Sequence, residues 1–139
     1  KALDLAKDAS WLLEARGKVV KIVAQLLPFL PPDHHYNVVF MERNLTEVIA
    51  SQNAMLARQG RRGADLDARQ LLETYAAQLQ RVRTLLVRRA EVRTLPINYS
   101  ELLADPPTAV DRLALFLGAP FNRGAAAQAV RPGLRRQKA

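Results

Sequence analysis

The chain has 139 residues, 49% of them apolar, which is the size and apolar content of one ordinary globular domain. It contains no cysteine, which excludes disulfides and thiolate chemistry, and no apolar run approaches the roughly 20 residues that span a bilayer. Together with the lack of a visible signal peptide, this leads us to expect a cytoplasmic location. Lysine and arginine number 21 against 13 acidic residues, a net charge of +8, so the surface is either simply solvated or binds an anionic partner.

The first quarter of the chain mixes helical and extended patterns. Residues 2–15 have mixed helical periodicity, and residues 18–23 (KVVKIV) are rich in β-branched side chains, which predicts a short strand. A helical turn follows over residues 24–30. The apolar run at residues 36–41 predicts a second strand.

Two helices are predicted next. The first covers residues 45–59, with Asn44 as its N-cap and Glu47 in the capping-box position three residues later. The second covers residues 67–89, where apolar residues recur at steps of three and four and indicate packing on a core.

The last third continues the alternation. Residues 92–98 predict a third strand, and residues 99–105 predict a short helix. Asp105 then caps a helix over residues 106–118, which begins at a proline and ends at a glycine. A weak helix is expected over residues 124–130.

Strands that alternate with helices predict the α/β class, with a small, mostly parallel sheet flanked by helices. We expect residues 1–139 to form a single domain. Three strands are few for this class, so we expect the fold to be incomplete at its N-terminus, as in a fragment. Residues 131–139 form either a disordered basic tail or part of a binding site.

Polar residues stand where the second predicted strand runs into its helix. Ligands bind parallel sheets where strands end, and the first N–H groups of the next helix favour an anion there. Arg43 stands at this junction and can bind a phosphate through two nitrogens, and Ser51 can add a hydroxyl donor. Alternatively, Arg43 pairs with Glu42 or Glu47, and Ser51 bonds back to a carbonyl.

The segment NVVFMERNLTEVIASQ resembles the 3′-phosphate-binding segment of sulfotransferases that use 3′-phosphoadenosine 5′-phosphosulfate, and bacterial members above all. The resemblance implies that Arg43 and Ser51 hold the 3′-phosphate of this cofactor. The later segment VRTLPINYSELLADPPTAVDRLALFLG is similar to a second signature of the family, which implies that Tyr99 lies near the adenine. The likeness extends over roughly residues 8–136.

The resemblance implies a P-loop-like three-layer fold and transfer of a sulfuryl group to an acceptor hydroxyl or amine. The resemblance makes Lys21 the candidate catalytic residue, since it matches a lysine that faces the donor in relatives, with a spacing that differs by a residue or two. Arg135 and Arg136 are the nearest substitutes for the family's C-terminal basic-glycine motif, and they would contact the cofactor. No spacing of His, Asp or Glu implies a metal.

Two family features are not found in this sequence. The Gly/Ser/Thr-rich phosphosulfate loop is missing, and Val23, Ala24 and Gln25 stand where cytosolic members place a catalytic histidine. Two hypotheses therefore stay open. The chain is a sulfotransferase or its cofactor-binding C-terminal part, or it is a catalytically inactive basic module that binds the phosphates of a nucleotide or nucleic acid. Nucleic acid is the less expected ligand, because aromatic residues are not interleaved with the basic ones.

Overall fold

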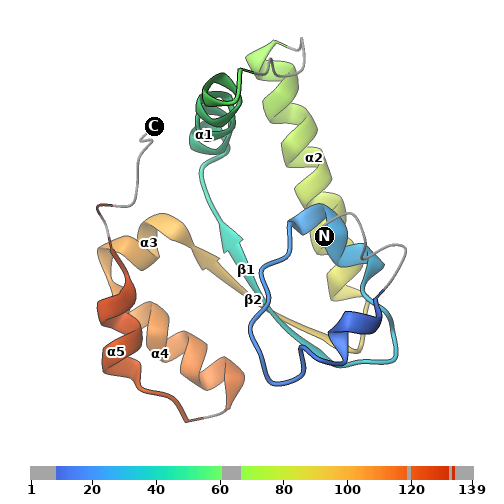
Figure 1. The fold of residues 1–139 in the computed structure, drawn as a ribbon, viewed down its shortest axis with the longest axis vertical. Helices are drawn as coiled ribbons and strands as arrows, with labels where there is room; N and C mark the ends of the chain where they lie inside the picture. The colour runs from blue at the N-terminus through green and yellow to red at the C-terminus, as the bar shows by residue number, and fades with distance from the viewer. Residues whose placement is uncertain (1–8, 61–66, 119, 132, 134–139) are drawn as a thin grey trace. The chain divides into compact units, whose positions relative to one another are not determined.

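The computed structural model describes residues 9–60, 67–118, 120–131 and 133. In chain order its elements are η1 (Ser10–Leu12), η2 (Ala24–Phe29), β1 (Tyr36–Glu42), α1 (Leu45–Arg58), α2 (Ala68–Val87), β2 (Val92–Asn98), α3 (Tyr99–Ala104), α4 (Pro106–Leu117) and α5 (Arg123–Ala129) (Figure 1). The succession of strands and helices confirms the predicted α/β class. The P-loop-like three-layer arrangement stays a prediction.

The sheet consists of β1 and β2, which run parallel and lie side by side (Figure 1). Its pairing begins where the backbone N–H of Tyr36 donates to the carbonyl of Glu91 at 2.8 Å. Parallel neighbours need a long crossover connection, and α1 and α2 provide it here. As a consequence, both strands end at the same edge of the sheet.

The chain divides into two compact units, and each contains part of the two strands. The first unit comprises residues up to 38 together with residues 77–94, and the second comprises residues 39–76 and those from 95 onward. Each unit has its own buried apolar side chains. In the first unit these are Leu12, Leu27, Leu30, Val82 and Leu86, and in the second they are Phe40, Ile49, Ile97, Ala109, Val110 and Ala114.

An arginine fastens the loop after η2 in the first unit. The Nη2 of Arg89 donates to the carbonyl of Leu30 at 2.7 Å, and its Nε donates to the Glu91 carboxylate at 2.6 Å. Nearby, the hydroxyl of Tyr36 donates to the carbonyl of Pro31 at 2.9 Å. Burial is the main reason why the pKa of Tyr36 is raised. These bonds satisfy carbonyls that follow a helix end, where the backbone has no partner of its own.

The predicted strand at residues 18–23 is wrong. This segment contains no strand, and Val19, Val20 and Val23 are exposed in it. A β-branched residue prefers strands because it packs well on a pleated surface, so the preference has no effect where no neighbouring strand lies alongside. The helix expected at residues 2–15 is also shorter in the described part, where only Ser10–Leu12 is helical.

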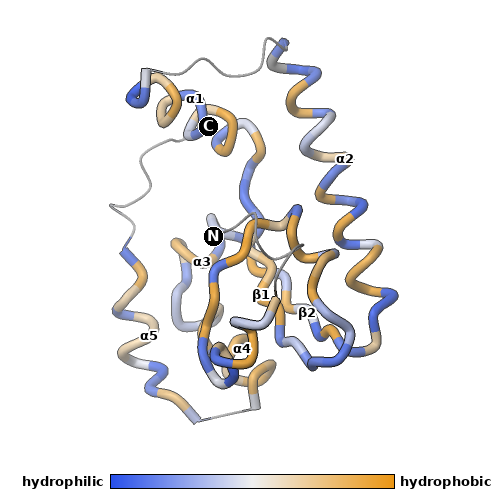
Figure 2. The backbone as a smooth tube through the Cα atoms, turned by 45° about the vertical axis from the view of Figure 1, so that its right-hand side comes forward, coloured by the Kyte–Doolittle hydropathy of each residue, from blue (hydrophilic) through white to orange (hydrophobic). Residues whose placement is uncertain are grey.

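Local signals place the remaining helices correctly. The side chain of Asn44 accepts from the N–H of Thr46 at 2.9 Å and caps α1. Asp105 accepts from the N–H of Thr108 at 3.2 Å and caps α4, which ends at Gly118 with a φ of +62°. Along α2, hydrophilic and hydrophobic residues alternate as a helix with one packed side requires (Figure 2).

Candidate functional site

Two strand-to-helix junctions lie at the carboxyl edge of the sheet, and both belong to the second unit. β1 passes through Arg43 and Asn44 into α1, while β2 ends at Asn98 and α3 begins at the next residue. Asn98 caps α3 by accepting from the N–H of Ser100 at 2.8 Å. Because asparagine favours the N-cap, both helices start immediately after their strands. The side chains that follow β1 and those that follow β2 therefore lie at the same edge of the sheet.

Arg43 and Tyr99 meet at this edge. The Cζ atom of Arg43 lies 5.1 Å from the centre of the Tyr99 ring, within the range of a cation–π contact. The Nε of Arg43 also donates to a carboxylate oxygen of Glu47 at 2.9 Å. The structure therefore brings together two of the predicted site residues, and it confirms the alternative prediction that Arg43 pairs with Glu47.

Ser51 lies on α1 and is partly buried. It follows Glu47 by four residues, so these two positions succeed one another on one side of the helix, while Arg43 precedes the N-cap. Ser51 comes six residues after the start of α1, which corresponds to a rise of about 9 Å. An anion that contacts both Arg43 and Ser51 therefore has to lie alongside the first turns of α1.

A side-chain hydrogen bond ties α1 to α2 within the second unit. The hydroxyl of Tyr75 on α2 donates to the side-chain carbonyl of Gln52 on α1. Gln52 is the direct neighbour of Ser51, so this bond restrains the part of α1 that carries the serine hydroxyl. Such a restraint favours a preformed position for Ser51.

The other predicted site residues are Lys21, Arg135 and Arg136. Lys21 belongs to the first unit, where it is exposed in the segment that lacks a strand. Arg135 and Arg136 lie outside the described residues. The predicted role of each stays a prediction.

The positive charge of the described residues is concentrated away from Arg43. In the first unit, residues 9–38 and 77–94 contain eight Lys and Arg against three Asp and Glu, an excess of five. In the described part of the second unit, six arginines face seven acidic residues, a balance of minus one. The described residues of this unit therefore provide no excess of positive charge around Arg43.

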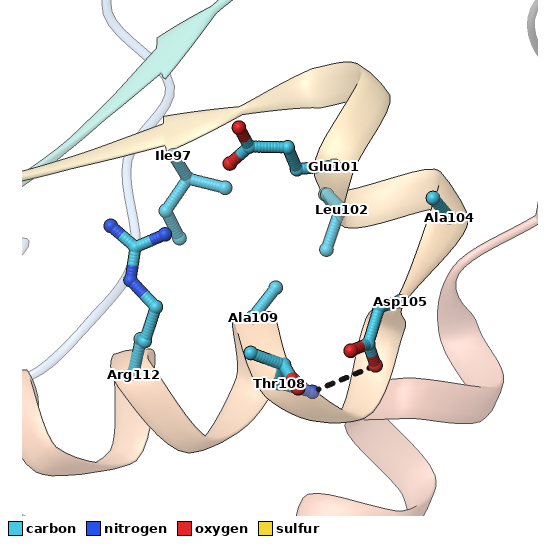
Figure 3. A pocket seen from close by; sticks show the side chains of 8 residues that line it. All are labelled: Ile97, Glu101, Leu102, Ala104, Asp105, Thr108, Ala109 and Arg112. Carbon is cyan, nitrogen blue, oxygen red and sulfur yellow. Dashed lines mark hydrogen bonds between the residues drawn. The ribbon is translucent and has the colours of Figure 1, made fainter.

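A separate pocket of about 290 Å³ lies where β2, α3 and α4 meet (Figure 3). Its lining residues are Ile97, Glu101, Leu102, Ala104, Asp105, Thr108, Ala109 and Arg112. The polar side chains with bonds here serve the fold: Asp105 caps α4, and Arg112 donates to the carbonyl of Pro96 at 3.0 Å. Arg43, Ser51 and Tyr99 do not line this pocket, so it is distinct from the Arg43 cluster.

The described residues provide neither a metal site nor a membrane-spanning helix. Among the described residues, no group of three or more His, Asp and Glu side chains is arranged to hold a metal ion. Within the same part of the chain, no helix has both the length and the apolar character to cross a membrane.

These features define an α/β protein that carries a basic and an aromatic side chain at the carboxyl edge of parallel strands. Residues 5–123 match the family model described as the sulfotransferase family. The match covers well over half of the chain, so the chain belongs to the sulfotransferase family. No curated protein and no solved structure gives a significant match.

Sequence reasoning named Glu47 only as a capping residue or as one possible partner of Arg43. In the structure Glu47 is buried, and it forms a hydrogen bond with Arg43, the residue predicted to bind the phosphate. The signal in the sequence was the spacing of four residues, with Arg43 just before the N-cap of α1 and Glu47 in its first turn. What the sequence did not show was the burial of the carboxylate, which depends on the packing of α1.

Proposed function

We propose that this member of the sulfotransferase family binds 3′-phosphoadenosine 5′-phosphosulfate through the edge where β1 and β2 end. Arg43 and Ser51 hold the 3′-phosphate, and Tyr99 lies against the adenine. The observation that carries the proposal is the meeting of Arg43 and Tyr99 from two strand ends, with Cζ 5.1 Å from the ring centre. Two separate segments of the sequence led to the assignment of Arg43 to the 3′-phosphate and of Tyr99 to the adenine, which are neighbouring parts of one cofactor.

The chemistry of these residues fits the cofactor. A guanidinium binds phosphate by charge and by paired hydrogen bonds, and a serine hydroxyl is a neutral donor for a further phosphate oxygen. The start of α1 adds the favourable dipole of a helix N-terminus. An aromatic ring offers a flat surface to a purine, as in other stacking contacts with bases.

In the reaction that we propose, the cofactor supplies the sulfuryl group that an acceptor hydroxyl or amine receives. Arg43 and Ser51 hold the 3′-phosphate, at the opposite end of the donor from that group. Their contribution is therefore to orient the bound donor, and correct orientation lowers the barrier to reaction. Lys21 remains the predicted catalytic candidate, and Arg135 and Arg136 remain predicted contacts to the same cofactor.

The test is calorimetric titration with adenosine 3′,5′-bisphosphate, the product form of the cofactor. We expect Arg43→Ala to remove a charged hydrogen bond worth about 1.5–3 kcal/mol, which weakens binding roughly 10- to 150-fold. Arg69→Ala is the matched control, because Arg69 also pairs with a glutamate four residues later but is 85% exposed on α2. Equal binding by the wild type and Arg43→Ala would refute the proposal.

A second candidate function rests on the charge of the first unit. Arg81 on α2 and Arg88, which directly follows α2, are exposed, and within the described residues neither pairs with a carboxylate. Such residues suit a catalytically inactive module that binds nucleic-acid phosphates. If this function applies, a fluorescent single-stranded oligonucleotide binds with an affinity that falls steeply with salt, and the double variant Arg81→Ala/Arg88→Ala loses most of that binding.

A further inference from the structure

Glu47 is the one charged side chain that is buried in the described part of the chain, with 1% of its surface exposed. It lies in the first turn of α1, and one of its carboxylate oxygens accepts from the Nε of Arg43 at 2.9 Å. A buried carboxylate is costly unless charged or polar partners compensate it. An apolar side chain at this position would avoid that cost, so the presence of a buried glutamate needs an explanation.

A second arginine–glutamate pair in the same molecule serves as a comparison. Arg69 and Glu73 on α2 have the same spacing and a similar Nε–oxygen distance of 3.0 Å, but their side chains are 85% and 65% exposed. Exposed pairs of this kind contribute little to stability. The pair at the site differs because Glu47 is buried and Arg43 is only 26% exposed. The small stabilisation that an exposed ion pair provides does not explain why Glu47 is buried.

Stability alone also gives a weak reason for such a pair. Replacing a buried ion pair by apolar residues of similar volume is often neutral or stabilising, because burial removes both charges from water. An alternative contribution is orientation. A guanidinium is planar and its donors have a fixed arrangement, so one bond at Nε restricts where its other nitrogens point.

Two contacts restrain the Arg43 guanidinium from different directions. Glu47 bonds Nε in the plane of the group, and the Tyr99 ring lies 5.1 Å from Cζ. The edge formed by the two terminal nitrogens points away from the Nε–H bond, as the covalent geometry of the group requires. Holding Nε therefore sets the direction of the edge that suits a phosphate.

We infer that Glu47 is a positioning residue, which orients the Arg43 guanidinium for the 3′-phosphate. The inference rests on the proposed function, since it assigns a role within the same site. It differs from a simple structural role, because it requires the carboxylate to act on the ligand through Arg43. It also differs from sequestration, in which Glu47 would compete with the phosphate for the arginine.

Two substitutions separate these roles. Glu47→Gln keeps an oxygen that accepts from Nε, whereas Glu47→Met fills a similar buried volume without any comparable acceptor. We expect Glu47→Gln to bind adenosine 3′,5′-bisphosphate within about threefold of the wild type, because the oriented bond is kept. We expect Glu47→Met to bind about tenfold more weakly, close to the loss of one good hydrogen bond.

A double-mutant cycle then connects the effect to Arg43. In the Arg43→Ala background, Glu47→Met should change the affinity by less than about twofold, because no guanidinium is left to orient. Glu73→Met is the matched control from the exposed pair and should leave the affinity unchanged. Thermal unfolding of each variant, recorded with and without ligand, verifies that the variants compared are folded.

Each result either supports or overturns the inference. Wild-type binding by Glu47→Met, with weakened binding by Arg43→Ala, would overturn the role of Glu47 and leave the proposed function intact. Stronger binding by both Glu47 variants would show sequestration and would also overturn it. Unchanged binding by Arg43→Ala would instead refute the proposed function, and with it the basis of this inference. If Glu47→Met does not fold, tenfold weaker binding by folded Glu47→Gln overturns the inference, because that variant retains the acceptor.

Discussion

The two compact units of this protein differ in charge and in what their arginines do. In the first unit, arginines dominate the end of α2 and the start of β2, and the described residues have an excess of five positive charges. In the described part of the second unit the charges nearly balance, yet this unit contains the cluster of Arg43, Glu47 and Tyr99. Among the described residues, seven of the ten exposed large apolar side chains also belong to the first unit.

Under the proposed function, net charge alone does not identify the site. The strongly basic composition first suggested an anionic partner, but Arg43, the residue predicted to bind phosphate, belongs to the unit whose described residues nearly balance in charge. We expect a single arginine to be effective there, because a buried carboxylate and an aromatic ring restrain its position. In the first unit, Arg81 and Arg88 are exposed, and Arg89 bonds backbone carbonyls. The predictions below test this division of roles.

The largest effect is expected in the core of the first unit. Leu86 is 1% exposed, so Leu86→Ala should lower the free energy of unfolding by about 2–5 kcal/mol, as for other buried leucines. Its neighbour Leu85 is 44% exposed, and Leu85→Ala should change stability by no more than about 0.5 kcal/mol. Urea unfolding measures both. Similar losses for the two variants would contradict the assigned packing of α2.

Two adjacent arginines sharpen the comparison within the first unit. Arg89→Ala removes charged hydrogen bonds to the Leu30 carbonyl and to Glu91, and should cost about 1.5–3 kcal/mol of folding free energy. Arg88→Ala removes an exposed side chain and should stay within about 0.5 kcal/mol of the wild type. The measurement is again urea unfolding. A larger loss for Arg88→Ala than for Arg89→Ala would reverse the roles given to these residues.

A smaller effect is expected at Ser51. If its hydroxyl donates to the 3′-phosphate, Ser51→Ala should cost about 0.5–1.5 kcal/mol of binding, or roughly two- to twelvefold in affinity for adenosine 3′,5′-bisphosphate. The loss should be smaller than that of Arg43→Ala, because a neutral donor makes the weaker bond. Calorimetry measures both variants. Unchanged affinity in Ser51→Ala would remove Ser51 from the site.

The smallest effect concerns the cap of α4. The hydrogen bond to Thr108 is the main reason why the pKa of Asp105 is lowered. Because the folded-state pKa is depressed, the stabilisation is present above the ordinary carboxyl pKa of about 3.9 and is lost as the pH falls through the folded-state value. Asp105→Asn keeps an acceptor that does not titrate, so its difference in melting temperature from the wild type should shrink in acid. A constant difference throughout the acid range would contradict this account.

Features set by neighbouring residues were predictable from the sequence. The caps at Asn44 and Asp105 depend on a side chain and on backbone groups two or three residues away, so the start of each helix followed directly. The bounds of β2 and the strand-to-helix junction at Arg43 were predicted for the same reason. The family itself was predicted from two segments and is confirmed by the family match.

Features set by tertiary packing were not predictable. The contact between Arg43 and Tyr99 depends on the register of two strands that are distant in sequence. The burial of Glu47 depends on how α1 packs, and the sequence placed this residue only in a helix cap. At residues 18–23, β-branched side chains predicted a strand that lacks a neighbour in the described structure.

The central claim is that Arg43 recognises the 3′-phosphate, and one pair of ligands tests it most directly. The affinities of adenosine 3′,5′-bisphosphate and adenosine 5′-monophosphate are measured for the wild type and for Arg43→Ala. The account predicts that the wild type prefers the bisphosphate at least about tenfold, or 1.4 kcal/mol, and that Arg43→Ala loses most of this preference. A preference that persists unchanged in Arg43→Ala, or that is missing from the wild type, would contradict the account.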